Sequence, residues 1–343
     1  YDFFVSLIVL HEPDKFGLRA SWAAGVRSRL PAAERKFLEE VMPFFYLPLH
    51  WIYSLPSPKD ATSVLWSLRQ IPVERRMHTL LVSNDMEAEI KDIFERVSSR
   101  SSWTEADLDL LKEASRKWDH KPTQKLLQTI LNWWSQPKEF GEKIQVALQS
   151  YYQNFFEEEE RRITPALNAA LERAQKLALR LSFPELLTEL SQGVQFSTRF
   201  EISELVLTPV YWSTPLIFFG KVSEDIELMT FGARPPDASL VPGEQVPDDL
   251  IHRLKALADP TRLKIMHYLT REPMTSSEMA RRLRLRTPTV IHHIKELRLA
   301  GLVHIIVEQE GERRYAPRQE AIQATYSTLM KFLEAEEVVK DGD

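Results

Sequence analysis

Three helix start signals follow one another within residues 259–301, and they constrain the fold more than any other feature of the chain. Asp259-Pro260 is typical of a helix N-terminus, because aspartate caps free backbone N–H groups and proline lacks the N–H that would stay unbonded there. Thr275 followed by Glu278 has the form of a capping box. Thr287-Pro288 is a cap followed by a proline and gives the third signal. The sequence therefore predicts three short helices joined by tight connections.

The residues after the third start signal predict a helix and then a two-stranded hairpin. Apolar residues recur at helical spacing on the face that must be buried, at Val290, Ile294 and Leu297. Gly301 is placed to end this helix. Residues 303–307 predict a strand, 310–312 a hairpin tip and 313–315 the returning strand. Three helices followed by such a hairpin are typical of a winged helix-turn-helix, which places its recognition helix in the major groove of DNA.

If the apolar face points inward, the residues on the other faces of the third helix and on the returning strand are the candidate DNA contacts. They are Arg286, Thr287, Thr289, Ile291, His292, Lys295, Arg313 and Arg314. A threonine hydroxyl can hydrogen-bond to several bases, and a threonine or isoleucine methyl group can contact a thymine methyl group. Lysine and arginine suit phosphates, which position a protein on the duplex without reading its sequence. We therefore expect double-stranded DNA as the partner.

The positive charge of the chain is concentrated in the same region. Residues 250–318 contain 14 Lys/Arg and 7 Asp/Glu, a net charge of +7, so with a total of -5 the remainder carries -12. A basic region on an acidic chain is typical of nucleic-acid contact through one region only. The coincidence of this charge with the motif supports the DNA-binding interpretation.

Four motifs in this order resemble those of the ArsR-type winged-helix transcriptional regulators: ALADPTRLKIMHYL, EMARRL, TPTVIHHIKELRLAGLV and a wing that ends in RRY. The resemblance covers roughly Leu250 to Leu333. It implies a homodimeric repressor whose first and last helices form the dimer interface. The last helix would supply an apolar stripe of Ile322, Tyr326, Leu329, Phe332 and Leu333. Two-fold symmetry would then present two recognition helices to an inverted-repeat operator, one helical turn apart.

The chain departs from the family pattern in the third helix and in the residues that could bind metal. The family often has serine where this chain has Ile291, and a capping serine where it has Arg286. Its metal sensors use cysteines in the third helix or histidines and carboxylates in the last, but this chain has no cysteine and no histidine in residues 318–343. The adjacent side chains of His292-His293 would point about 100° apart on a helix and would not converge on a metal. We therefore expect no metal site and no cofactor.

Residues 1–234 have the pattern of a mainly helical domain. Glycine accounts for only 10 of 343 residues, which favours helices with short connections. Start signals precede amphipathic runs at residues 84–87, at Thr104, at Pro122 and at Thr164-Pro165. The charged run just before the last of these signals predicts a solvated helix face.

The predicted fold class is mainly α, with a multi-helix N-terminal domain, a small β element and a C-terminal winged helix-turn-helix domain. The β element of three or four strands lies at about 194–232, where the period changes to alternation. Four prolines between 235 and 247 predict a linker. The winged-helix domain follows at 248–336, with Asp248 or Asp249 as the cap of its first helix, and an acidic tail ends the chain at 337–343.

Aromatic residues are concentrated in the N-terminal domain. All 8 tryptophans and 13 of the 17 phenylalanines precede residue 213. Such a concentration suits either a pocket for an apolar or aromatic small-molecule effector or an ordinary helical core, and the sequence leaves both open. The N-terminal domain also resembles a long uncharacterised domain that precedes the winged helix in some bacterial regulators. That resemblance carries no known chemistry.

Several function classes are disfavoured by what the sequence lacks. The absence of cysteine excludes disulfides and a cysteine nucleophile. The HExxH, GxSxG, P-loop and GxGxxG motifs do not occur, so we do not expect an enzyme. The apolar run Phe3–Leu10 is too short for a signal peptide or a membrane span, so we expect a cytoplasmic protein without a membrane partner.

The sequence as a whole predicts a sequence-specific DNA-binding transcriptional regulator. The expected form is a repressor that an unknown effector of the N-terminal domain controls. One alternative is an enzyme in the N-terminal domain with an autoregulatory winged helix. The other is a winged helix used for protein contacts or for non-specific DNA packaging.

Overall fold

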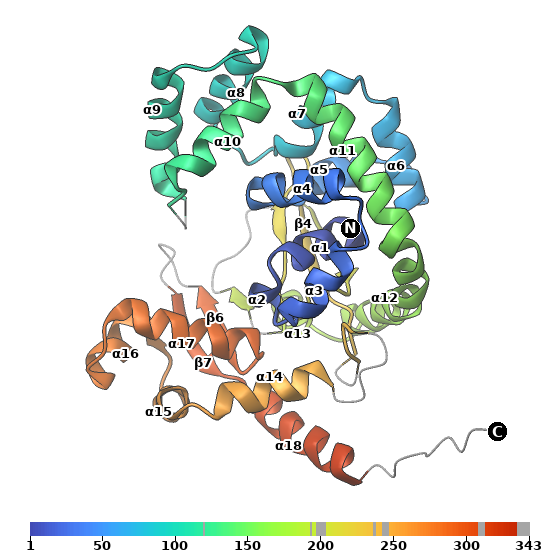
Figure 1. Ribbon diagram of the computed structural model, residues 1–343. Helices are drawn as coiled ribbons and strands as arrows, with labels where there is room; N and C mark the ends of the chain where they lie inside the picture. Colours follow the sequence, from blue (N-terminus) through green and yellow to red (C-terminus); the bar gives the residue numbers. More distant parts are fainter. Residues whose placement is uncertain are drawn as a thin grey trace, which may run out of the picture.

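The computed structural model of the chain is mainly helical, which confirms the predicted fold class (Figure 1). It describes residues 1–118, 121–192, 194–196, 204–235, 238–241, 247–307 and 313–334. The predicted hairpin tip at 310–312 and acidic tail at 337–343 lie outside the described residues, as does part of the predicted linker. Within the described ranges, no helix combines the length and the apolar character needed to cross a membrane.

The N-terminal part consists of helices arranged as an arch around a central helix, α1 (Figure 1). Its α-helices are α1 (Asp2–His11), α2 (Pro13–Phe16), α3 (Ala20–Arg27), α4 (Ala32–Val41), α5 (Leu49–Ser54), α6 (Ala61–Gln70), α7 (Arg76–Leu81), α8 (Ala88–Arg100), α9 (Glu105–Ala114), α10 (Gln124–Trp134), α11 (Pro137–Tyr151), α12 (Glu157–Ala178) and α13 (Phe183–Leu190). Shorter turns are η1 (Met42–Phe44), η2 (Val73–Arg75), η3 (Ser115–Lys117) and the π-helical turn η4 (Tyr152–Phe156).

Helix α1 is buried over residues 2–10 and forms the centre of the N-terminal core. Its sequence is apolar on nearly every side, which is typical of a helix surrounded by protein. Phe3 packs edge-on against Phe156 with ring centroids 5.2 Å apart, and Phe4 stacks on Phe45. Aromatic pairs of this kind fill the core, so much of the aromatic content of the N-terminal part is used in packing.

A nearly continuous helical segment runs from α11 through η4 to α12, and the helix start predicted at Thr164-Pro165 is wrong. Pro165 lies inside α12. Ile163 before the proline and Ala174 after it are both buried, so packing against the core holds the helix together where the backbone N–H is missing. The Thr164 hydroxyl donates to the carbonyl oxygen of Glu160 (2.6 Å) in the same turn.

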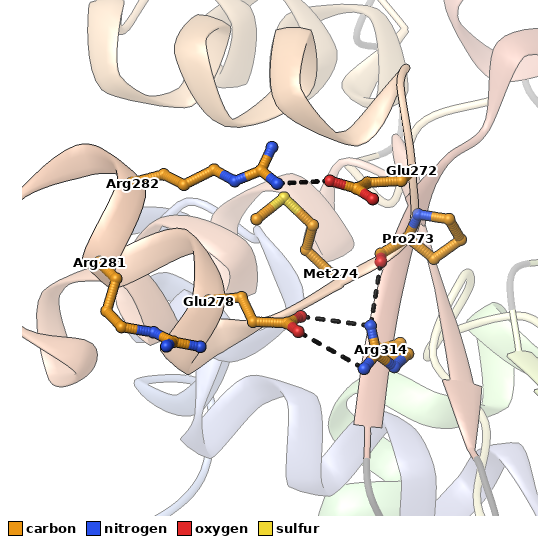
Figure 2. A pocket seen from close by; sticks show the side chains of 7 residues that line it. All are labelled: Glu272, Pro273, Met274, Glu278, Arg281, Arg282 and Arg314. Atoms are coloured by element: carbon orange, nitrogen blue, oxygen red, sulfur yellow. Dashed lines mark hydrogen bonds and ion pairs between the residues drawn. The ribbon is translucent and has the colours of Figure 1, made fainter.

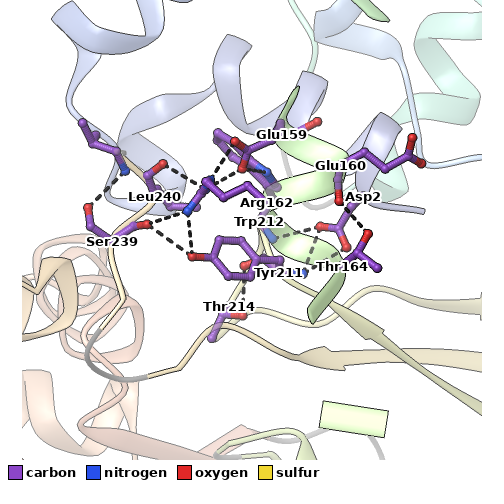
Figure 3. Close-up of polar contacts among 12 residues, drawn as sticks. Asp2, Glu159, Glu160, Arg162, Thr164, Tyr211, Trp212, Thr214, Ser239 and Leu240 are labelled. Carbon is purple, nitrogen blue, oxygen red and sulfur yellow. Dashed lines mark hydrogen bonds and ion pairs between the residues drawn. The ribbon is translucent and has the colours of Figure 1, made fainter. Parts of the chain in front are cut away.

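The charged residues at the start of α12 are partly buried, so the predicted solvated face is wrong for two of them (Figure 3). Glu159 is 4% exposed and accepts a hydrogen bond from Arg162 Nε (2.9 Å) and one from Trp212 Nε1 (3.0 Å). Arg162 also donates to the Tyr211 hydroxyl (3.2 Å). The backbone N–H groups of Tyr211 and Trp212 donate to the Asp2 carboxylate (2.9 and 3.0 Å). Buried charges persist when they are paired, so this network ties α1 and α12 to the segment after β2.

The small β element is present, and the structure divides it between two sheets. Its strands are β1 (Val194–Phe196), β2 (Glu204–Val210), β3 (Phe219–Lys221) and β4 (Ile226–Gly232). Strand β4 pairs in parallel with β2 and antiparallel with β3, which gives the order β2-β4-β3. Strand β1 instead joins the sheet of the wing, where it pairs in parallel with β6, with Val194 opposite Ile305.

The C-terminal part is a winged helix-turn-helix. Its elements are α14 (Asp248–Leu257), α15 (Pro260–Leu269), β5 (Met274–Thr275), α16 (Ser276–Leu283), α17 (Thr287–Leu299), β6 (Val303–Val307), β7 (Arg313–Pro317) and α18 (Gln319–Glu334). Strands β6 and β7 are antiparallel, and the sheet order is β1-β6-β7-β5. Helix α18 extends away from the rest of the molecule (Figure 1).

Two of the four helix caps predicted in this part are confirmed. The Asp259 carboxylate accepts from the N–H groups of Thr261 and Arg262 at the start of α15, and Thr275 forms a capping box with Glu278. The other two are shifted by one or two residues: Thr287 is the first residue of α17, whose N-cap is Arg286, and Pro247 rather than Asp248 or Asp249 is the N-cap of α14.

Asp249 is instead used to join the two parts of the chain. Its carboxylate lies 3.2 Å from Arg234 Nη2, just after β4, and 3.4 Å from Arg253 Nη2 on α14. The Arg234 side chain is only 2% exposed and also donates to the carbonyl oxygen of Thr214. A second close approach involves Gly17 (φ +71°), where an added Cβ would lie 2.5 Å from the His252 ring of α14. These contacts are tertiary, which is why the capping position predicted from local sequence is not used.

We expect Asp249→Asn to lower the free energy of unfolding by about 3 kcal/mol, because it leaves the buried Arg234 guanidinium without its counter-ion. Urea denaturation of the whole chain, followed by far-UV circular dichroism, measures the change. Glu172→Gln is the control, since its ion pair with Lys176 is exposed and should contribute at most about 0.5 kcal/mol. Equal effects of the two substitutions would contradict the role given to Asp249.

Candidate DNA-binding surface

Helix α17 is held against the core of the domain by one face. Val290, Ile294 and Leu297 on that face are between 0% and 2% exposed, which confirms the predicted buried face. The turn before α17 begins at Arg284, which adopts the left-handed conformation (φ +55°) and ends α16. Helices α16 and α17 therefore meet at a short turn, and the rotation of α17 about its own axis is fixed by the three buried side chains.

This rotation leaves most of the predicted contact residues of α17 in solvent. The exposed ones on the helix are Thr289, Ile291, His292 and Lys295. Arg286 is exposed at the N-cap, and Thr287 is half-buried. The structure thus places four of the eight predicted residues on the exposed faces of α17, with Arg286 and Thr287 at the N-terminus of the same helix. Such a surface carries hydroxyl, methyl, imidazole and cationic groups, the mixture that base edges and phosphates recognise.

The two adjacent histidines of α17 point in different directions. His292 is exposed, whereas His293 is half-buried and its Nδ1 atom lies 3.8 Å from the Asp259 carboxylate at the start of α15. A backbone hydrogen bond from Arg262 holds the pKa of Asp259 below its usual value, with a smaller contribution from His293. In the described ranges, no group of three His, Asp or Glu side chains is arranged to hold a metal ion.

The two arginines of the wing have different surroundings. Arg313, at the start of β7, is exposed. Arg314 is half-buried and donates to the Glu278 carboxylate (3.2 and 3.5 Å) and to the carbonyl oxygen of Pro273 (3.2 Å), as Figure 2 shows. A hydrogen bond from the backbone N–H of Thr275 is the main cause of the lowered pKa of Glu278, and the charge of Arg314 lowers this pKa further. Arg314 therefore joins the wing to the capping box of α16, a role that sequence reasoning missed because Glu278 lies 36 positions away.

A hollow of about 460 Å³ lies beside this ion pair, between α16 and the strands (Figure 2). It is lined by Glu272, Pro273, Met274, Glu278, Arg281, Arg282 and Arg314. Arg282 forms an ion pair with Glu272, whereas Arg281 is exposed and has no ion pair with any described residue. Arg281 adds a cation to this side of the domain that the sequence analysis did not single out. The signal available was the Arg281-Arg282 pair in the EMARRL motif.

Comparison with known proteins gives the same placement of the motif. Residues 257–306, from the end of α14 into β6, match the protein family described as a helix-turn-helix domain. A 65-residue segment, 19% of this chain, is 35% identical to an uncharacterized HTH-type transcriptional regulator of Methanocaldococcus jannaschii and covers 68% of that protein. By this similarity, together with the helix-turn-helix geometry of α16 and α17, the chain belongs to the HTH-type transcriptional regulators.

Proposed function

We propose that this protein is a sequence-specific DNA-binding transcriptional regulator of the ArsR type, and that it acts as a repressor. The observation that carries the proposal is the rotation of α17, which buries Val290, Ile294 and Leu297 and exposes Thr289, Ile291 and His292 on its other faces. Residues near the start of a recognition helix are the ones that reach base edges. Binding of α17 at an operator would exclude other proteins from the same DNA.

In this proposal, the phosphate contacts come from the wing and from the residues of α17 beyond Ile291. Arg313 is exposed at the start of β7, and Lys295 lies one turn beyond Ile291 on α17. Cations at these two places would contact the backbone on either side of the groove that α17 enters. Arg314 would hold the wing in position through Glu278, in addition to any phosphate contact of its own.

The proposed regulator is a homodimer whose interface is formed by α14 and α18. The two helices pack against each other. Apolar side chains on them stay in solvent: Tyr326 is 67% exposed and Leu333 66% on α18, and Leu254 is 40% exposed on α14. Ile322, at the start of the same stripe, is partly buried against the domain core, so the exposed stripe is a continuation of that core. A second copy of this chain related by a two-fold axis would cover the stripe and would present two recognition helices to an inverted repeat.

Control by an effector requires two states of the dimer. An effector changes operator affinity only if it binds one state more tightly than the other. In the present fold, strand β1 and the Arg234–Asp249 ion pair connect the N-terminal part to the winged helix. A change in these contacts would alter the position of α17 relative to its partner in the dimer, and with it the match to the half-site spacing.

Footprinting of selected DNA fragments tests the function and the dimer together. We expect the native chain to protect one defined inverted repeat. Tyr326→Asp should give a monomer in analytical ultracentrifugation and lose this protection, because a charge in the dimer interface must be desolvated. The control is Ser327→Asp, which lies on another side of α18. Protection without a preferred site would favour DNA packaging instead, and no protection at all would favour a winged helix used for protein contacts.

Arg313→Ala should weaken binding to all DNA sequences alike and reduce the slope of log K against log salt by about 1 per subunit, because one phosphate contact is lost. Arg314→Ala should have the same effect on the slope and should also destabilise the domain, since it leaves Glu278 without its partner. Fluorescence anisotropy over a salt series measures both. Lys112→Ala on α9 is the matched control, and a slope that stays unchanged in the Arg313 variant would rule out its phosphate contact.

Thr289→Ala is expected to relax the preference at one base pair of each half-site by about 1–3 kcal/mol while affinity for random DNA stays the same. Competition binding with operators that carry single base-pair changes detects this pattern. Thr129→Ala on α10 removes a hydroxyl that bonds within its own helix and serves as the control. Uniform weakening at every position would show that Thr289 contacts the backbone rather than a base.

A further inference from the structure

A crevice lies where strand β1 of the N-terminal part meets the winged helix. Because β1 pairs in parallel with β6, Val194 lies on the same face of the sheet as Ile305. Val303 is two residues before Ile305 and packs in the winged-helix core, so this face is the one that α17 covers. Strand β1 thus widens the sheet past the edge of α17, and the crevice is the space between them.

The crevice has a volume of about 370 Å³ and its walls come from both parts of the chain. Its lining includes Lys15, Phe16 and Ile217 from the N-terminal part and Lys295, Arg298 and Leu299 from α17. The volume lies in the lower range of small-molecule pockets, about 300–1,000 Å³. Most of the lining is apolar, so the crevice suits a ligand with an apolar body.

The charges in the crevice are all positive. Lys15 forms an ion pair with Glu12 (2.6 Å), but Lys295 and Arg298 have no hydrogen bond or ion pair with any side chain in the described part of the molecule. No aspartate or glutamate is among the described lining residues. Lys295, Arg298 and Leu299 have the spacing that places side chains on one face of a helix. The two cations and the apolar side chain of Leu299 therefore lie side by side on α17.

Arg298 carries an unfavourable charge in this position. It is half-buried, and burial, together with the nearby Arg313, lowers its pKa. A guanidinium nevertheless stays protonated in proteins. A partly desolvated cation without a counter-ion costs free energy, which a bound anion would recover.

We propose that this crevice binds a small organic anion, a carboxylate carried on an alkyl or aryl body. The carboxylate would lie at Arg298 and Lys295, and the body would pack against Phe16, Ile217 and Leu299. The evidence for this binding site is the geometry of the crevice and does not depend on DNA binding. Its consequence for regulation rests on the proposed function: the ligand would engage Lys295, a predicted phosphate contact, and would therefore lower operator affinity.

Isothermal titration calorimetry on the full chain without DNA tests the site. The probes are sodium octanoate and the uncharged octanamide. Octanoate should bind with a Kd below about 1 mM, and octanamide at least tenfold more weakly, because only the acid supplies a counter-ion for Arg298. Absence of octanoate binding at this concentration, or equal binding of the two probes, would overturn the proposal.

Two substitutions locate the binding. Arg298→Gln should weaken octanoate binding at least tenfold, while Lys264→Gln, an exposed cation of α15 outside the crevice, should leave it unchanged. Ile217→Glu places a negative charge on the opposite wall and should abolish octanoate binding without altering α17. Since Ile217 belongs to the N-terminal part, this variant remains informative if the Arg298 variant fails to fold. Unchanged affinity in a folded Ile217→Glu protein would place the ligand elsewhere.

A second measurement separates the site from its regulatory effect. At saturating octanoate, affinity for the operator found by site selection should fall at least about fivefold, the lower end of typical coupling between sites. If octanoate binds as expected but operator affinity does not change, the regulatory role is wrong and the site stands. A chain that binds octanoate but no DNA would contradict the proposed function alone.

Discussion

The burial of one face of α17 is the interaction on which the rest of the site depends. Val290, Ile294 and Leu297 are almost fully withdrawn from water, and each such side chain contributes roughly 1.5–3 kcal/mol relative to exposure. A rotation of α17 by a single residue position would bring polar side chains into the core. The three apolar residues thus determine which side chains can reach a DNA groove, although none of them can touch DNA.

Around this helix the chain builds two kinds of connection. Inside the domain, Arg314 and Glu278 join the wing to α16, so the strand that carries Arg313 and Arg314 is fixed relative to the helix-turn-helix. Between the two parts, β1 adds backbone hydrogen bonds to the edge of the wing sheet, and Asp249 pairs with the buried Arg234. The strand pairing and the ion pair therefore connect the domain that contains α17 to the large helical N-terminal part. Coupling between a ligand site and a DNA site requires that each ligand bind one state of the protein more tightly than another.

The same α17 carries two surfaces. Its outer side has the groups that suit DNA, and the side toward β1 has Lys295, Arg298 and Leu299 in a crevice shared with the N-terminal part. Lys295 lies where the two surfaces meet. In the proposed mechanism, a ligand in the crevice would neutralise charge at Lys295 and so weaken its contact with DNA, without a large movement of the domains.

Elements with local signals could be predicted from the chain alone. Helical spacing predicted the buried face of α17. Asp259 and Thr275 predicted two helix starts, because capping depends on residues within one turn. Other features depend on contacts between distant segments. Asp249 pairs across the domain boundary, Pro165 lies inside a helix that packing supports, and β1 pairs with the wing strand β6 instead of with β2, β3 or β4. These features depend on groups that are far apart in the sequence. A local sequence pattern does not show which distant group a side chain or strand will pair with, because the free energy gained by burial or pairing depends on the folded arrangement.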